Sequence, residues 1–116
     1  MAQPMIGTVT REALEVAAAD TGPTIQVFTN QTGALQAGRG FYLAAGEGAE
    51  AAASAARTGG ILYEGRIPKA LMETMRTGGL ASDQAMQWVG SNATSATMYI
   101  DARAAEFVIP FLKPVP

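Results

Sequence analysis

A glycine-flanked arginine and two aromatic residues stand together in the segment "GRGFY", residues 38–42. The two glycines permit sharp turns and close approach of the backbone to a ligand. Arg39 offers the planar fork that binds phosphate groups, and the ring of Tyr42 could stack on a flat heterocycle. The same pattern is also typical of a glycine turn that carries a solvated arginine beside a core aromatic pair. Both interpretations stay open on these residues.

A second candidate for chemistry is Glu106, in "ARAAEFVIP". Residues 106–112 are predicted to form a strand, so its leading carboxylate would lie at the rim of a sheet. There it could stabilise developing positive charge or accept a hydrogen bond from a sugar hydroxyl. The alternative is an ordinary solvated strand-end glutamate, paired with Arg103. Glu64 and Arg66 share one face of an earlier predicted strand and are expected to form a solvated pair.

The elements that must position these residues follow from the pattern along the chain. Helices are expected at 8–20, 46–57 and 69–77, strands at 24–29, 40–45, 61–67, 96–101 and 106–112, and polar loops at 30–40 and 82–95. Thr10 is the expected N-cap of the first helix. The fold class is therefore α+β, with a small mixed β-sheet and helices packed on it. At 116 residues the chain predicts a single domain, 1–116.

Composition excludes several kinds of chemistry. Cys and His are absent, so disulfides, thiolate nucleophiles, imidazole bases and Cys/His zinc sites are excluded, and no metal is expected. The formal net charge of −2 does not favour a nucleic-acid partner. Charged residues make up 16% of the chain, below the roughly 25% usual in soluble domains, which is compatible with a surface covered by a partner. No apolar run of about 18 residues predicts a membrane span, and no signal peptide is expected.

Three segments together resemble the ADP-ribosyltransferase-like toxins of the diphtheria-toxin type. They are "IQVFTNQT", "GRGFYLAAGEGAEAAA" and "AEFVIP", and "LYEGRIPKALMETM" is similar to the middle of C-terminal domains of polymorphic bacterial toxins. The resemblance implies a small split mixed β-sheet around a cleft for NAD, which is the substrate. It implies Tyr42 as the residue that stacks on nicotinamide and Glu106 as the catalytic carboxylate. Thr29 or Asn30 stands where the family carries His, and Arg39 and Gly40 complete the expected NAD-binding set.

The function expected from this resemblance is an NAD-dependent ADP-ribosyltransferase or NAD-cleaving toxin domain. A toxin would be delivered by a secretion system, would act in the cytoplasm of a target cell on an unknown target, and would have a cognate immunity protein. Two alternatives stay open. One is a ribonuclease toxin domain that works without His, and the other is a non-enzymatic binding or immunity module.

Overall fold

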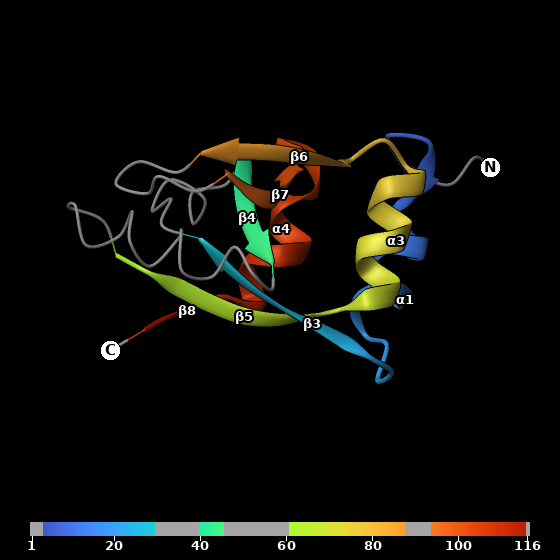
Figure 1. Ribbon diagram of the computed structural model, residues 1–116. Helices are drawn as coiled ribbons and strands as arrows, with labels where there is room; N and C mark the ends of the chain where they lie inside the picture. The colour runs from blue at the N-terminus through green and yellow to red at the C-terminus, as the bar shows by residue number, and fades with distance from the viewer. Residues whose placement is uncertain (1–3, 30–39, 46–60, 88–93, 116) are drawn as a thin grey trace.

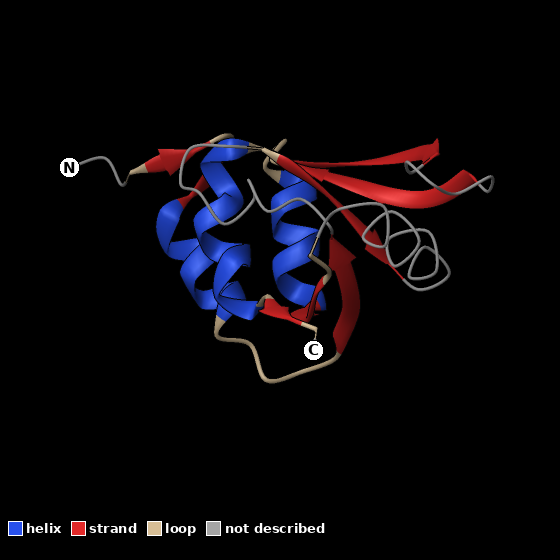
Figure 2. Ribbon diagram, turned by 90° about the vertical axis from the view of Figure 1, so that its left-hand side faces the viewer, coloured by secondary structure: helices blue, strands red, loops and turns tan. Residues whose placement is uncertain are grey.

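The computed structural model describes residues 4–29, 40–45, 61–87 and 94–115. Helices and a sheet form two layers, and Figure 2 shows the helices on one side of the strands. The predicted helix 46–57 and most of the predicted loop 30–40 lie outside the described residues. The α+β class is confirmed.

The N-terminal part of the chain contains a short ribbon followed by a helix. Strands β1 (Met5–Ile6) and β2 (Val9–Thr10) pair antiparallel, and α1 (Arg11–Ala18) follows directly. The Thr10 hydroxyl accepts a hydrogen bond from the Ala13 amide at 3.1 Å, which confirms Thr10 as the N-cap. The helix therefore begins at Arg11 rather than at residue 8, because Val9 and Thr10 are held in the ribbon.

The main sheet has six strands in the order β6-β7-β4-β3-β5-β8 (Figure 1). Their bounds are β3 (Thr24–Thr29), β4 (Phe41–Ala45), β5 (Tyr63–Pro68), β6 (Ala81–Gln87), β7 (Thr94–Ile100) and β8 (Lys113–Pro114). Every pairing among them is antiparallel, so the expectation of a mixed sheet was wrong. Parallel neighbours need long crossover connections, whereas β6 and β7, for example, are joined by only the residues 88–93.

The prediction of a polar loop at 82–95 was also wrong. Most of these residues belong to β6 and β7, which pair over seven residues each. Few of its side chains suggest a strand when the sequence is read alone. The long antiparallel ladder with β7 supplies the stabilisation that intrinsic preference lacks.

The predicted strand at 106–112 is instead a chain of short helices. They are η3 (Ala102–Ala104), α4 (Ala105–Val108) and η4 (Ile109–Phe111). The buried residues Ala104, Ala105, Phe107 and Val108 have the spacing of one helical face. Asp101 starts the run by accepting a hydrogen bond from the Arg103 amide at 2.8 Å. Apolar residues also alternate along this segment, which suggested a strand, but the residues that are buried follow the helical spacing.

The core lies between the helices and one face of the sheet. Helix α3 (Lys69–Thr77) matches its predicted bounds and buries Leu71, Met72 and Met75. It meets Leu14 of α1, residues of α4 and the inward side chains of the strands, which include Val27, Phe41, Leu43, Ile67, Met98 and Ile100. The opposite face of the sheet is therefore separated from α1, α3 and α4.

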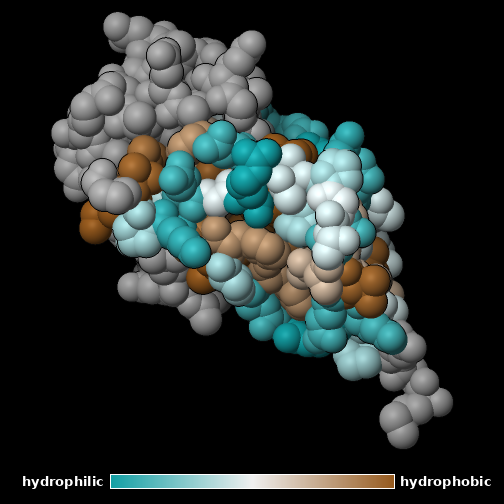
Figure 3. All heavy atoms as spheres, turned by 90° about the horizontal axis from the view of Figure 1, so that it is seen from below, coloured by the Kyte–Doolittle hydropathy of each residue, from teal (hydrophilic) through white to brown (hydrophobic). Residues whose placement is uncertain are grey.

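Large hydrophobic side chains that are more than half exposed come from separate segments. Among the described residues they are Met5, Val16 and Ile61. Seen from below, apolar side chains form a band that is flanked by hydrophilic ones (Figure 3). Single exposed apolar residues of this kind are ordinary on protein surfaces.

Candidate functional site at the junction of β3 and β4

Tyr42 lies on the face of the sheet that is turned away from the helices. Its neighbours Phe41 and Leu43 are both buried in the core, with 1% and 0% of their surface exposed. Side chains alternate along a strand, so Tyr42 must project from the other face. It is half-buried there.

The ring of Tyr42 packs against Tyr99 of β7. The two residues are directly opposite in the antiparallel register, their ring centroids are 5.1 Å apart, and their planes are inclined by 58°. Tilted aromatic pairs at this distance are favourable. Tyr99 was not singled out from the sequence, because cross-strand neighbours become visible only once the register is known.

The pairing between β3 and β4 is short within the described residues. Among the described residues the two strands pair only through Val27 with Ala45 and Phe28 with Ala44. Beyond Phe28 the two strands separate, as Figure 1 shows, while β4 continues along β7 for four residue pairs and β3 along β5 for six. β3 and β4 remain neighbours in one six-stranded sheet, and Tyr42 lies on the part of β4 beyond their last described pair.

Thr29 is the last residue of β3 and is fully buried. It is opposite Tyr63, which belongs to the core, so its side chain faces the helices. Thr29 and Tyr42 thus lie on the two strands that diverge, but their side chains project from opposite faces. Asn30 and Arg39, the other predicted NAD-binding residues of this region, lie outside the described residues.

Gly40 has a packing reason to be glycine. A Cβ atom at this position would overlap the hydroxyl oxygen of Tyr99, and it would lie 2.7 Å from the ring carbon Cζ. It would also lie 3.0 Å from the carbonyl oxygen of Ile100. The sequence suggested that a ligand approaches this glycine, and the structure shows the side chain of Tyr99 there.

Glu106 is on α4 rather than on a strand, which corrects its predicted place at the rim of the sheet. Its carboxylate forms a bidentate ion pair with Arg11 of α1, with Nη1–Oε1 at 2.7 Å and Nη2–Oε2 at 3.2 Å. The same guanidinium contacts Glu15 at 3.2 Å and lies 5.1 Å from the ring centre of Phe107. The hydrogen bond from Arg11 lowers the pKa of Glu106 below its ordinary value.

Glu106 and Tyr42 lie on opposite sides of the sheet. The neighbours of Glu106, Phe107 and Val108, are buried in the same core as Phe41 and Leu43, whereas Tyr42 projects away from it. The two side chains therefore do not line one cleft. Arg103, the partner expected for Glu106, binds Asp101 instead, at 2.9 Å.

Glu64 is the carboxylate that shares a face with Tyr42. It is opposite Phe28 in the register, and Phe28 is opposite Ala44, two residues from Tyr42. The other acidic residue on a described strand, Asp83, faces the helix layer, where it binds Arg76 at 3.0 Å.

The solvated pair expected between Glu64 and Arg66 does not form. The Arg66 Nε donates to the Thr24 hydroxyl at 2.9 Å, and no ion pair among the described residues involves Glu64. Glu64 is half-buried. It is therefore a carboxylate on the Tyr42 face that makes no ion pair with a described arginine, and Lys113 of β8 is its cross-strand neighbour.

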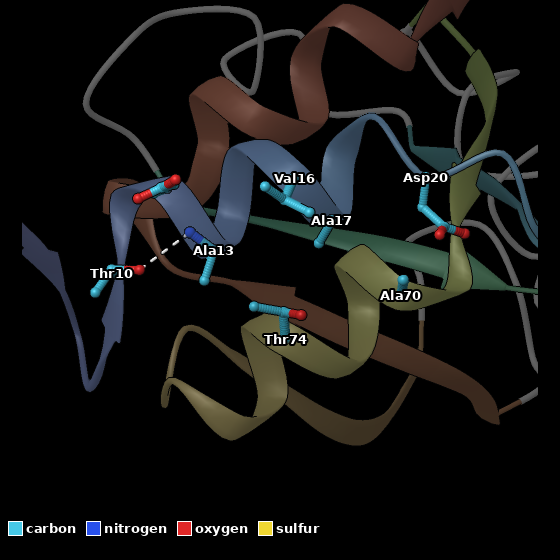
Figure 4. A pocket seen from close by; sticks show the side chains of 8 residues that line it. Thr10, Ala13, Val16, Ala17, Asp20, Ala70 and Thr74 are labelled. Atoms are coloured by element: carbon cyan, nitrogen blue, oxygen red, sulfur yellow. Dashed lines mark hydrogen bonds between the residues drawn. The ribbon is translucent and has the colours of Figure 1, made fainter.

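A separate groove lies between α1 and α3, as Figure 4 shows. It has a volume of about 490 Å³ and is lined by Thr10, Glu12, Ala13, Val16, Ala17, Asp20, Ala70 and Thr74. Three of its eight lining residues are alanine, and Asp20 accepts a hydrogen bond from the Gly22 amide at 2.9 Å. None of the residues predicted from the sequence to bind or cleave NAD lines it.

The described residues also bear on metal binding and on membrane insertion. The described ranges hold no group of three or more Asp, Glu, His or Cys residues that could bind a metal ion. No helix in them has the length and apolar character needed to span a bilayer. No family model, curated protein or solved structure matches this chain.

Proposed function

We propose that this chain is a small NAD-binding and NAD-cleaving domain with an ADP-ribosyltransferase-like fold. The observation that carries the proposal is the divergence of β3 and β4 beyond their last described pair, Phe28 with Ala44. These are the two strands to which the sequence resemblance assigns the NAD site, and their divergence beyond Phe28 supports a split sheet. The nicotinamide ring would stack on Tyr42, at the point where the strands separate.

The catalytic carboxylate in this proposal is Glu64 rather than Glu106. The Glu106 charge is neutralised by Arg11 on the far side of the sheet, so it cannot stabilise a cation beside Tyr42. Glu64 projects from the same face as Tyr42 across β3, two strand spacings or roughly 10 Å from β4. Phe28 of β3 stands between Glu64 and β4 on the same face, so a ligand that meets both Tyr42 and Glu64 would lie over the Phe28 side chain.

The reaction needs only electrostatic help from the protein. The bond between the ribose C1′ and the nicotinamide nitrogen breaks, the nitrogen keeps both electrons, and neutral nicotinamide leaves. A carboxylate beside the sugar stabilises the positive charge that develops on it. Water, or a nucleophile on a target molecule, then adds to C1′ and loses a proton. Action as a toxin and inhibition by an immunity protein remain predictions from the sequence.

The experiment is release of nicotinamide from NAD by the purified chain, with Glu64→Gln and Glu106→Gln as a matched pair. Both substitutions remove one negative charge and keep the size of the side chain. We expect Glu64→Gln to lower the turnover by about 10²–10³-fold, which is typical for loss of one transition-state contact. We expect Glu106→Gln to retain wild-type turnover.

Two outcomes would contradict the proposal. If the wild-type chain released no nicotinamide and did not bind NAD, the assignment to NAD chemistry would be wrong. If Glu106→Gln lost turnover while Glu64→Gln kept it, the assignment of Glu64 rather than Glu106 as the catalytic carboxylate would be wrong. Cleavage of total RNA in the absence of NAD would favour the ribonuclease alternative.

A further inference from the structure

The aromatic pair of β4 and β7 is built around a glycine. Tyr42 and Tyr99 are opposite each other in the register. Gly40 precedes Tyr42 by two residues, so both positions are on the same face of the sheet. The positive-φ glycines among the described residues are Gly7 and Gly79, so Gly40 is not required by its backbone conformation. Its lack of a side chain leaves the space that the Tyr99 hydroxyl occupies, so a Cβ atom at residue 40 would make the Tyr99 ring move.

This arrangement fixes the Tyr99 ring from two directions. Its tip rests against the Gly40 backbone, and its side meets the Tyr42 ring at 5.1 Å with a 58° tilt. A tyrosine ring held only by its own torsions would have more freedom than one that packs on both sides. The orientation of Tyr42 therefore depends on Tyr99, and that of Tyr99 depends on the absence of a side chain at residue 40.

We propose that Tyr99 is a positioning residue for the flat cationic ring that stacks on Tyr42, and that Gly40 is the spacer that admits it. The proposal rests on the proposed function. The oxidised nicotinamide ring carries a positive charge, and the face of a tyrosine attracts a cation. The reduced ring and free nicotinamide are neutral. A correctly oriented Tyr42 face therefore favours NAD+ over both NADH and the released product.

The experiment measures the dissociation constants of NAD+ and NADH by titration for the wild-type chain, Gly40→Ala, Tyr99→Phe and Tyr99→Leu. We expect wild type to favour NAD+ over NADH by about 2- to 30-fold, the range typical of cation–π contacts. Tyr99→Phe keeps the ring and should keep this preference. Tyr99→Leu and Gly40→Ala should reduce it towards one, because each disturbs the orientation of Tyr42.

The double variant Gly40→Ala/Tyr99→Leu separates packing from ligand positioning. Removing the ring tip makes room for the new methyl group, so the urea midpoint of the double variant should lie above that of Gly40→Ala. The NAD+ preference should stay lost, because Tyr42 has no ring to pack against. The near-UV circular dichroism of the tyrosine band, recorded without ligand, reports the orientation of the rings independently of NAD.

The outcomes distinguish this inference from the proposed function. If wild type favours NAD+ and Tyr99→Leu favours it equally, positioning by Tyr99 is wrong while the NAD site stands. If Gly40→Ala leaves both the urea midpoint and the tyrosine band at wild-type values, the spacer role is wrong whether or not NAD binds. If no variant and no wild-type chain binds NAD+, the proposed function fails and the ligand role of Tyr99 fails with it.

Discussion

Glu106 on α4 and Tyr42 on β4 are the two catalytic residues predicted from the sequence, and they lie on opposite sides of the sheet. Glu106 is held by Arg11, which also contacts Glu15 and lies near the Phe107 ring. Tyr42 meets another aromatic residue across a strand pair, near the point where β3 and β4 diverge. The comparison teaches that a carboxylate with a close arginine supports the packing of helices, whereas an aromatic ring on the other face of the sheet is left to its cross-strand neighbour and, in our proposal, to a ligand.

The largest expected contrast lies between two neighbours on β4. Leu43 is fully buried in the core and Tyr42 is half-buried on the other face. We expect Leu43→Ala to lower the free energy of unfolding by about 2–5 kcal/mol. Tyr42→Ala should lose less, about 0.5–1.5 kcal/mol for the aromatic pair, but should weaken NAD binding. Urea unfolding of both variants measures the contrast, and equal losses would show that the two faces do not differ in this way.

A smaller effect is expected at the cap of α1. The Thr10 hydroxyl accepts from the Ala13 amide, and Thr10→Ala should lower the free energy of unfolding by about 1 kcal/mol. Thr10→Ser, which keeps the hydroxyl, is the matched control and should lose little. Because this end of the molecule lies on the helix side, NAD turnover measured well below the unfolding transition should not change. A loss of turnover in Thr10→Ala would place the helix layer within the functional site.

The smallest expected effect concerns the ion pair of Glu106 and its dependence on pH. Arg11 lowers the pKa of Glu106 in the folded state, so the pair adds stability at pH values above the ordinary glutamate pKa. That contribution is lost as the pH falls through the lowered pKa of the folded state. We expect wild type to be slightly more stable than Glu106→Gln near pH 7 and the difference to vanish once the pH lies below the lowered pKa of Glu106 in the folded state. The effect is small because both side chains are substantially exposed.

The measurement is urea unfolding of wild type and Glu106→Gln at a series of pH values. A stability difference that grew as the pH fell would contradict the assigned direction of the pKa. Asp101 also has a lowered pKa, because Arg103 donates hydrogen bonds to it. This pair is present in both the wild type and the Glu106→Gln variant. The difference between them therefore isolates Glu106.

Parts of the fold could be predicted because local signals determined them. The strand at 24–29 and the helix at 69–77 were predicted with the observed bounds. A run of β-branched residues indicated the strand. A proline followed by an amphipathic pattern indicated the helix. The cap at Thr10 likewise follows from a local side-chain interaction. The region 106–112 failed because its apolar residues fit both a strand and a helix, and tertiary burial of Ala104, Ala105, Phe107 and Val108 decided between them.

The candidate site was less accessible to sequence reasoning than the fold. The approach of a group to Gly40 could be anticipated from the glycine, but Tyr99 is 59 positions away and is brought there only by the β4–β7 register. The partnership of Arg11 and Glu106 has the same cause, since it joins residues 95 positions apart. Interactions of this kind depend on topology, and neither residue type nor local spacing signals them.

The most direct test of the central claim is to titrate NAD+ into the ¹⁵N-labelled chain and follow the backbone amide resonances. We expect the shifts to change most at Gly40, Tyr42 and Tyr99, and to change little at Arg11 and Glu106. Changes centred on Arg11 and Glu106, or no changes at any amide, would contradict the placement of a ligand site on the Tyr42 face of the sheet.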